Sequence, residues 1–260
     1  MLQAKTALIT GSTSGIGKAI ASRLAQAGAN VVINGFGDAN EIEEFRQSLE
    51  KDHGIKALYS GADLTRQDQI ESMMEETMSA FGGVDVLVNN AGVQHVSPIE
   101  EFPVEKWELI ISLNLTSSFH TTRLTLPGMK ERGWGRIINT ASAHALVASP
   151  YKSAYVAAKH GIAGLTKVIA LEGATHGVRC NAICPGYVYT PLVENQIADT
   201  AKARGISEKE VKENVLLAAQ PTKEFVTSEQ VAEMAYFLCS PAADQINGTL
   251  MQMDGGWVAQ

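Results

Sequence analysis

The sequence predicts an α/β protein in which one doubly wound parallel sheet of about seven strands is covered by helices on both faces. Three observations predict it. Short apolar runs alternate with longer amphipathic stretches, a glycine-rich loop joins the first run to the first amphipathic stretch, and no proline- or serine-rich linker divides the chain. A length of 260 residues allows one large domain or two small ones. The unbroken alternation favours a single domain over residues 1–260.

The apolar runs are short and rich in β-branched residues, which is typical of buried strands. The first run, at 6–10, stops at Gly11, and the second, at 31–33, is closed by Asn34 and Gly35. Each later run is likewise separated from its neighbours by a longer amphipathic stretch. The predicted strands lie at 6–10, 31–33, 56–59, 84–88, 136–139, 178–183 and 249–253.

Between the strands, apolar residues recur at helical spacing, as Ile16, Ile20 and Leu24 do before the stop at Gly28. The predicted helices lie at 15–28, 39–53, 67–81, 104–131, 153–176 and 228–239. Residues 190–222 break the alternation, because they carry two helix-like stretches with no strand between them. Long insertions in compact domains are often functional loops. We therefore expect a helical lid over a substrate site at about 190–222.

Composition excludes several classes of protein. With 45% hydrophobic and 19% charged residues the chain is neither disordered nor collagen-like, and its net charge of −7 disfavours a dedicated nucleic-acid binder. It has no apolar run long enough to cross a membrane and no signal sequence at its start, so we expect a cytoplasmic protein without a membrane partner. Cys180, Cys184 and Cys239 are expected to be free, buried thiols, and no ligand cluster indicates a metal site.

The glycine-rich loop reads Thr10-Gly-Ser-Thr-Ser-Gly-Ile-Gly17. Gly11 permits a tight turn after the first strand, and Gly15 lets the backbone approach a pyrophosphate closely. Gly17 lets the first helix pack on the strand. Phosphate groups would then meet the positive N-terminus of that helix. The loop therefore predicts a dinucleotide site.

This loop and four later motifs resemble, in the same order, the short-chain dehydrogenase/reductase family. The later motifs are Asp63-Leu64 after the third strand, Asn89-Asn-Ala-Gly92 after the fourth, Pro185-Gly186 after the sixth, and Asp254-Gly-Gly256 near the C-terminus. The resemblance implies a Rossmann-type fold that binds a nicotinamide dinucleotide. The implied cofactor residues are Gly11, Thr13, Gly15, Ile16, Gly17, Phe36, Asp63, Leu64, Asn90, Ala91, Gly92, Tyr155, Lys159, Pro185, Gly186, Val188 and Thr190.

The end of the second strand bears on the choice between NAD and NADP. NAD-binding folds commonly place an acidic residue there, and NADP-binding folds a basic one. The stretch Asn34-Gly-Phe-Gly-Asp38 contains no base, and Asp38 would repel a 2′-phosphate. NAD is therefore the expected cofactor. Phe36 either flanks the adenine or packs in the core, and the sequence leaves both interpretations open.

Tyr155 and Lys159 lie four residues apart and so share one face of a helix. An ammonium one turn away can lower the pKa of a phenol enough for acid–base chemistry, although the same spacing also fits a surface pair. Ser142 and Asn114 complete a set that matches the family. The resemblance implies that Tyr155 exchanges a proton with substrate, Ser142 bonds the substrate oxygen, Lys159 lowers the Tyr155 pKa and binds the nicotinamide ribose, and Asn114 holds a water.

Polar residues near this set indicate the substrate class. Lys152 supplies positive charge, while Gln94, His144 and Gln196 supply directional donors that suit a small carboxylate. The resemblance implies the substrate residues Gln94, Ser142, His144, Lys152, Tyr155, Tyr187, Gln196 and Trp257. Together they predict reversible, NAD-dependent oxidation of a small hydroxy acid to a keto acid.

Other functions fit parts of the pattern. A 3-oxoacyl-carrier-protein reductase shares fold and catalytic set but normally uses NADP and docks an acidic carrier, which this acidic chain suits poorly. A sugar or polyol dehydrogenase would not need Lys152 and His144 together. A dinucleotide-sensing regulatory protein would commonly have lost part of the Tyr155–Lys159 pair. The resemblance also implies a homotetramer, with the helices near 104–131 and 153–176 and the C-terminal strand at its interfaces.

Overall fold

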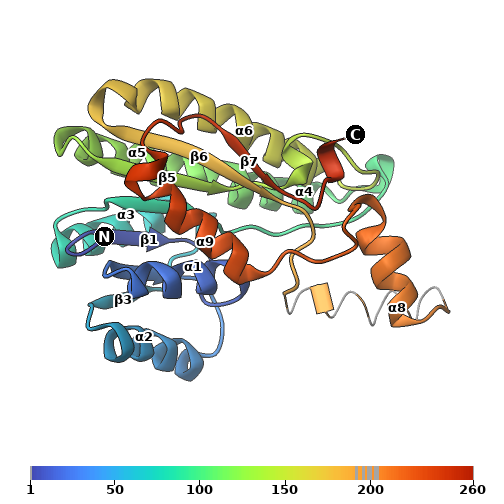
Figure 1. Ribbon diagram of the computed structural model, residues 1–260, viewed down its shortest axis with the longest axis horizontal. Helices are drawn as coiled ribbons and strands as arrows, with labels where there is room; N and C mark the ends of the chain where they lie inside the picture. Colours follow the sequence, from blue (N-terminus) through green and yellow to red (C-terminus); the bar gives the residue numbers. More distant parts are fainter. Residues whose placement is uncertain (1, 191–192, 195–196, 198–200, 202–204, 260) are drawn as a thin grey trace.

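The computed structural model describes residues 2–190, 193–194, 197, 201 and 205–259. Seven strands form one sheet in the order β3-β2-β1-β4-β5-β6-β7, and every neighbouring pair is parallel, as predicted (Figure 1). The strands are β1 Thr6–Ile9, β2 Asn30–Asn34, β3 Ala57–Ser60, β4 Val86–Asn89, β5 Gly135–Thr140, β6 Val178–Pro185 and β7 Leu250–Met253. The chain reverses strand order between β1 and β4, where parallel sheets commonly place their ligands.

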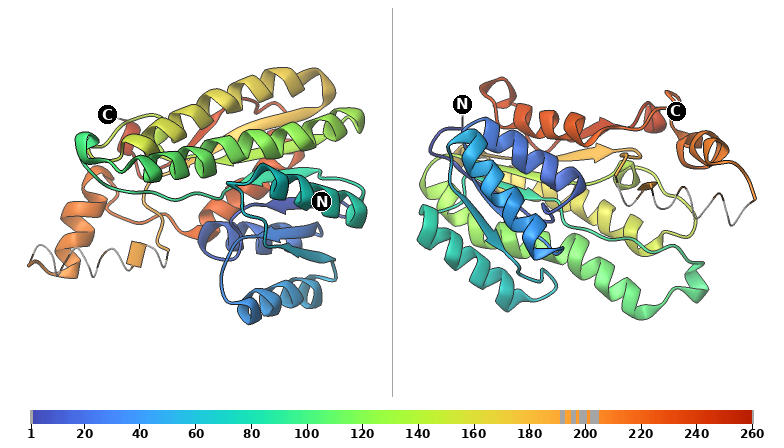
Figure 2. Two further views of the ribbon diagram at one scale, coloured as in Figure 1. Left: turned by 180° about the vertical axis from the view of Figure 1, so that it is seen from behind. Right: turned by 90° about the horizontal axis from the view of Figure 1, so that it is seen from below.

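Helices cover both faces of the sheet (Figures 1 and 2). The first face carries α1 Gly15–Gln26, α2 Ala39–His53 and α9 Ser228–Leu238. The second carries α3 Gln67–Phe81, α5 Ser117–Glu131 and α6 Ser153–Gly173. Figure 2 shows α5 and α6 running alongside each other on this second face. None of the helices in the described part of the chain is both long and apolar enough to cross a bilayer.

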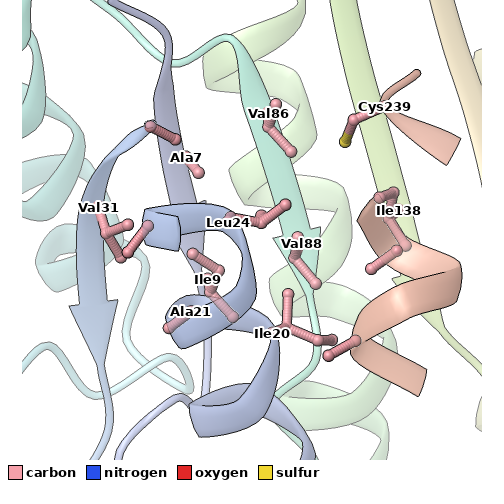
Figure 3. Close-up of a cluster of buried hydrophobic side chains, with 14 of the residues drawn as sticks. Ala7, Ile9, Ile20, Ala21, Leu24, Val31, Val86, Val88, Ile138 and Cys239 are labelled. Carbon is pink, nitrogen blue, oxygen red and sulfur yellow. The ribbon is translucent and has the colours of Figure 1, made fainter. Parts of the chain in front are cut away.

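The core on the first face is built from alternate residues of the central strands (Figure 3). Ile9 and Val88 point toward α1, where they meet Ile20 and Leu24. The intervening residue Leu8 belongs to the core on the other face, because successive strand residues point to opposite sides. All these side chains are fully buried, and every residue of β1 is buried, as expected for a strand covered on both sides. This packing fixes the strand ends that carry the site.

The three cysteines are free and buried, as expected. Cys239 ends α9 against the first core, and Cys180 packs in the second. Burial raises the pKa of Cys184 to about 11, so this thiol is protonated at neutral pH.

The helix predicted near 104–131 spans these residues, with a change of helical type in its middle that was not predicted. α4 (Val104–Ile111) is followed by a π-helical turn at Ser112–Thr116, and only then does α5 begin. The turn presents the side chain of Asn114 to the backbone of Val93, from which its Oδ1 accepts and to which its Nδ2 donates, both at 2.9 Å. Single-turn π bulges often occur at functional sites. Apolar periodicity does not reveal one, because the contact that stabilises it comes from a distant loop.

The predicted insertion at 190–222 falls partly outside the described residues. Within it, α8 (Glu208–Val211) begins at Ser207, which forms a capping box with Glu210. A π-helical turn at Lys212–Leu216 and a short turn at Leu217–Ala219 follow. Figure 1 shows α8 at the edge of the molecule, apart from the helices that cover the sheet.

Candidate active site

A cavity of about 680 Å³ opens along the carboxyl ends of the strands, where the predicted dinucleotide site was expected. The segments after all seven strands contribute to it. The predicted residues that line it are Gly11, Thr13, Gly15, Ile16, Phe36, Asp63, Leu64, Asn90, Ala91, Gly92, Gln94, Ser142, His144, Lys152, Tyr155, Lys159, Pro185, Gly186, Tyr187, Val188, Thr190 and Trp257. Gly17 and Asn114 lie behind this lining, and Gln196 lies outside the described residues.

Lining residues that the sequence analysis missed are mostly small or apolar. They are Ser14, Asn34, Gly35, Ala62, Thr65, Val93, Leu109, Leu113, Thr140, Ala141 and Val193. Most of them lie one or two positions from a predicted residue, so the cavity lining extends slightly beyond each predicted motif. Leu109 and Leu113 come from α4 and the π turn, next to the predicted Asn114 but outside any motif themselves.

Backbone contact explains the glycines of the first loop. Gly11 has φ +61°, and a Cβ built on it would lie 2.8 Å from the Cα of Ala91. A Cβ on Gly17 would collide with the carbonyl oxygen of Gly11. The Asn90 side chain ties the two loops together, donating to the carbonyls of Thr10 and Gly11 at 3.1 and 3.0 Å.

The N-terminus of α1 is suited to an anionic group. Ser14 occupies the N-cap position without a side-chain hydrogen bond to the helix, and the first turn contains no acidic residue. Gly15 and Ile16 of that turn line the cavity. The first amides of a helix have no partner within it, and they carry the positive end of its dipole. This end of the cavity therefore fits the phosphates of a dinucleotide.

At the far end of the cavity, Phe36 is 68% exposed. The alternative that Phe36 packs in the core is therefore wrong, and its ring is free to flank a planar group. Asp38 does not line the cavity. Its carboxylate caps α2, accepting from the amides of Asn40 and Glu41. Among the described lining residues, the Lys side chains are Lys152 and Lys159, at the other end.

Asp63 and Asn34 organise the loops beside Phe36. Asp63 Oδ1 accepts from both the amide and the hydroxyl of Thr65, at 2.9 and 2.8 Å. The Asn34 amide donates to the carbonyls of Ser60 and Ala62. The ends of β2 and β3 are thereby held together under the cavity.

Tyr155 and Lys159 project from α6 into the cavity, as their spacing predicts. Lys159 is 4% exposed, and its Nζ donates to the carbonyl of Thr140 at 2.6 Å. Burial lowers the pKa of Lys159 to about 8. Desolvation raises the pKa of Tyr155, and a hydrogen bond with Ser142 opposes that rise. In this arrangement the Lys159 ammonium bonds a strand carbonyl and lies 5.5 Å from the Tyr155 ring centroid.

His144 lies between two serine hydroxyls. Its Nδ1 is 3.4 Å from Ser142 Oγ and its Nε2 is 2.9 Å from Ser149 Oγ. The residue is 3% exposed, and burial, reinforced by the charge of Lys152, lowers the pKa of His144 to about 4. The imidazole is therefore neutral at pH 7, and its contribution to the site is a hydrogen bond, not a charge.

This pKa makes a prediction about acid stability. Between about pH 6.5 and 4 the His144 imidazole is protonated in the unfolded chain but stays neutral in the folded protein. Acidification over this interval therefore lowers the free energy of unfolding by up to about 3 kcal/mol. Urea unfolding of the wild type and of His144→Asn, at pH 7 and pH 4.5, measures the effect. The variant is expected to lose much less stability over that interval than the wild type. His176→Asn, at an exposed position, is the control. Equal losses in His144→Asn and wild type would contradict the prediction.

The predicted substrate residues Lys152, Tyr187, His144 and Trp257 form one wall of the cavity. The Lys152 ammonium donates to the Tyr187 hydroxyl at 3.4 Å and lies 5.4 Å from that ring's centroid. The Tyr187 and Trp257 rings stack at 5.8 Å with 7° between their planes, and His144 meets Trp257 edge-on at 5.1 Å. The wall therefore offers one cation framed by aromatic rings.

Comparison with known proteins gives consistent results. The sequence matches the short chain dehydrogenase family over residues 5–201. D-beta-hydroxybutyrate dehydrogenase of Rhizobium meliloti is 59% identical over 256 residues, which cover 98% of this chain and 99% of that protein. The protein of the same name from Cupriavidus necator is 56% identical over 260 residues, 100% of both chains.

A solved structure shares the whole fold. L-sorbose reductase from Gluconobacter frateurii, whose crystal structure is a complex with NADPH and L-sorbose, has a TM-score of 0.94 at 32% identity. The match covers 100% of this chain and 98% of that chain.

Proposed function

The chain belongs to the short chain dehydrogenase family, and on that premise we propose that it catalyses the reversible oxidation of D-3-hydroxybutyrate to acetoacetate with NAD. One observation carries the choice of substrate. The Lys152 ammonium faces the cavity from the same wall as Tyr187 and Trp257, close to Tyr155 on α6. A carboxylate at Lys152 and a hydroxyl at Tyr155 are the two ends of a short hydroxy acid.

The full-length relatives support the same substrate. Both D-beta-hydroxybutyrate dehydrogenases match this chain from end to end. Three short sequences add to that similarity: Phe-Gly-Asp at 36–38, Ser-Ala-His at 142–144 and the C-terminal Asp-Gly-Gly-Trp257.

The cofactor, when bound, supplies the hydride acceptor, and the chain's residues place and polarise the substrate. Ser142 hydrogen-bonds the substrate oxygen, and Tyr155, as a phenolate stabilised by the Lys159 ammonium, takes the hydroxyl proton as the carbon–hydrogen bond breaks. Lys159 binds the nicotinamide ribose and sits on the path by which the proton leaves. The side-chain amide of Asn114 pairs with the Val93 backbone and so orders that loop. In this proposal Asn114 also holds a water.

Gln94, His144 and Lys152 hold the substrate carboxylate, with Gln196 as a fourth proposed ligand. A neutral His144 donates a hydrogen bond, while Lys152 adds a charge-assisted one, which is the stronger kind. Trp257 closes the pocket on the side of the methyl group, and Tyr187 lies beside Lys152 at the carboxylate end.

NAD is preferred to NADP in this proposal. A 2′-phosphate would sit near Phe36, where the described lining contains no Lys or Arg side chain. The N-terminus of α2 there is already capped by the Asp38 carboxylate, whose negative charge disfavours a second anion.

The test is a panel of acids and alcohols assayed by NADH or NADPH formation at 340 nm. We expect D-3-hydroxybutyrate with NAD to give the highest kcat/KM, the L enantiomer to be inactive and NADP to be poorly used. Efficient turnover of neutral polyols without turnover of the hydroxy acid would favour a sugar dehydrogenase. Activity confined to thioesters with NADPH would favour a 3-oxoacyl-carrier-protein reductase, and binding of NAD without any turnover would favour a sensor.

Replacing Lys152 tests the carboxylate site. Lys152→Ala should raise KM for the acid tenfold or more, because it removes a charge-assisted hydrogen bond worth about 1.5–3 kcal/mol. KM for NAD should stay the same. Lys56→Ala, an exposed lysine far from the cavity, is the matched control and should behave as wild type. An unchanged KM in Lys152→Ala would remove this residue from the site.

The protein is also proposed to form a homotetramer. Apolar side chains are exposed along the outer face of two helices, with Phe119 on α5 and Val168 and Leu171 on α6. Val168 and Leu171 lie three apart and so form one stripe. Covering such a stripe by a second copy would remove it from water. Sedimentation equilibrium at micromolar concentration tests the assembly, and a monomer there would refute it.

A further inference from the structure

Gln220 is a fully buried amide that belongs to no motif found in the sequence. Its exposure is 0%, and it lies just after the short turn at Leu217–Ala219. Its Oε1 accepts from the backbone N–H of Tyr187 at 2.5 Å, and its Nε2 donates to the carbonyl of Glu224 at 2.7 Å. A buried amide with both ends paired holds its neighbours in one arrangement, because breaking either bond leaves an unsatisfied polar group.

The same amide packs on the turn that follows β6. A Cβ built on Gly186 would collide with Gln220 Oε1, so the glycine is required by this side chain. The Gly186 amide in turn donates to the carbonyl of Met253, at the end of β7, at 3.0 Å. Gln220 thus fixes the turn from which the Tyr187 ring projects.

Thr222, two residues after Gln220, holds a second turn, which carries Trp257. The Thr222 amide donates to the carbonyl of Gly255 at 3.2 Å, and a Cβ on Gly255 would collide with the Thr222 hydroxyl. Asp254 closes this turn by accepting from the amides of Gly256 and Val258, both at 3.0 Å.

Residues 220–222 therefore connect the two turns whose aromatic side chains stack on each other. The relative position of those turns decides whether the Tyr187 and Trp257 rings meet at 5.8 Å and 7°. It also decides where the Tyr187 hydroxyl lies, and Lys152 donates to that hydroxyl at 3.4 Å.

We propose that Gln220 is a positioning residue for the carboxylate end of the substrate. It acts through Tyr187, whose ring and hydroxyl hold the Lys152 ammonium in place, and it does not itself line the cavity. The proposal rests on the proposed function in one respect, since it assumes that Lys152 receives an acid.

The primary test is Gln220→Leu, which keeps the volume and removes both side-chain hydrogen bonds. KM for the hydroxy acid is expected to rise about tenfold, with kcat within about threefold of wild type and KM for NAD unchanged. Gln47→Leu is the matched control, since it removes an exposed glutamine bonded to Glu43 on α2. A KM for the acid equal to that of wild type, or an equal rise in KM for NAD, would overturn the inference.

A double-mutant cycle separates positioning from general loss of structure. In a Lys152→Ala background, Gln220→Leu should add little to the KM of the acid, because the group that it positions is gone. Full additivity of the two effects would overturn the inference. If Gln220→Leu does not fold, Gln220→Glu replaces it. When the carboxyl group is protonated, it can form both hydrogen bonds of the glutamine. When it is ionised, it places a negative charge against the Glu224 carbonyl, so the KM of Gln220→Glu for the hydroxy acid, relative to wild type, should rise with pH.

A spectroscopic readout decides the question independently of turnover. The near-UV circular dichroism of wild type minus Trp257→Phe contains the signal of the stacked pair, and the same difference measured in the Gln220→Leu background should be largely lost. A persistent signal would contradict the inference. If the wild type oxidises none of the hydroxy acids, the proposed function fails, and this spectrum still decides the role of Gln220 in aligning Tyr187 with Trp257.

Discussion

Tyr155→Phe should abolish turnover while leaving the protein folded and able to bind NADH. Removing a general acid–base group costs about 10²–10⁴-fold in kcat, and we expect a loss of at least about 10³-fold here. The ring remains, so packing on α6 is retained. The hydroxyl is the group hydrogen-bonded to Ser142, and the change leaves that serine without this partner.

The measurements are kcat for the hydroxy acid and the dissociation constant of NADH by fluorescence. Tyr236→Phe, on α9 at the face away from the cavity, is the matched control and should keep full activity. Residual activity in Tyr155→Phe above about a tenth of wild type would mean that another group transfers the proton.

Gly17→Ala should damage both stability and cofactor binding. The added Cβ would collide with the Gly11 carbonyl and with the Asn90 amide, which are backbone and paired side-chain groups with little freedom to move. Forcing an extra carbon into a packed site costs about 1–3 kcal/mol. Because the collision pushes α1 away from the loop, kcat/KM for NAD should fall about 100-fold, as expected for a displacement of about 1 Å in a binding site.

Gly54→Ala is the control for this substitution. Gly54 ends α2 with φ +65°, and a Cβ there would meet nothing within 4 Å. It should cost about 1 kcal/mol from backbone strain alone, with no change in cofactor affinity. Urea unfolding and NADH titration of both variants make the comparison. Equal effects on NADH affinity would show that the close contact at Gly17 does not shape the site.

The fold could be predicted from the sequence because the apolar runs, the amphipathic stretches between them and the glycine-rich loop all indicate the same parallel sheet covered by helices. Short runs rich in apolar residues identified the seven strands, and burial of β1 on both faces explains why its run is mostly apolar. The π turn at Ser112–Thr116 could not be predicted, since its cause is the pairing of Asn114 with Val93, twenty-one positions earlier. Local periodicity carries no information about such a contact.

The part of the candidate site that could be predicted consists of residues whose spacing along a single helix or loop brings them together. Tyr155 and Lys159 share a helix face for that reason. The surroundings of each group were not predictable. Asp38, which was expected to repel a 2′-phosphate, has its carboxylate bonded at the N-terminus of α2, and the Lys159 ammonium bonds the Thr140 carbonyl. Gln220 was not predicted, because a single glutamine before a proline belongs to no sequence motif. Its hydrogen-bond partners, the Tyr187 amide and the Glu224 carbonyl, are known only from the structure.

The π turn at Ser112–Thr116 also sets a rotational phase between the two helices that it joins. Each residue of an α-helix advances about 100° around the axis, so one additional residue in a turn offsets everything before it by about that angle. Leu109 on α4 faces the cavity while Met129 on α5 faces the second core. Deleting a single residue from the turn would give a more regular helix, but it would swing Leu109 away from the cavity and separate Asn114 from Val93.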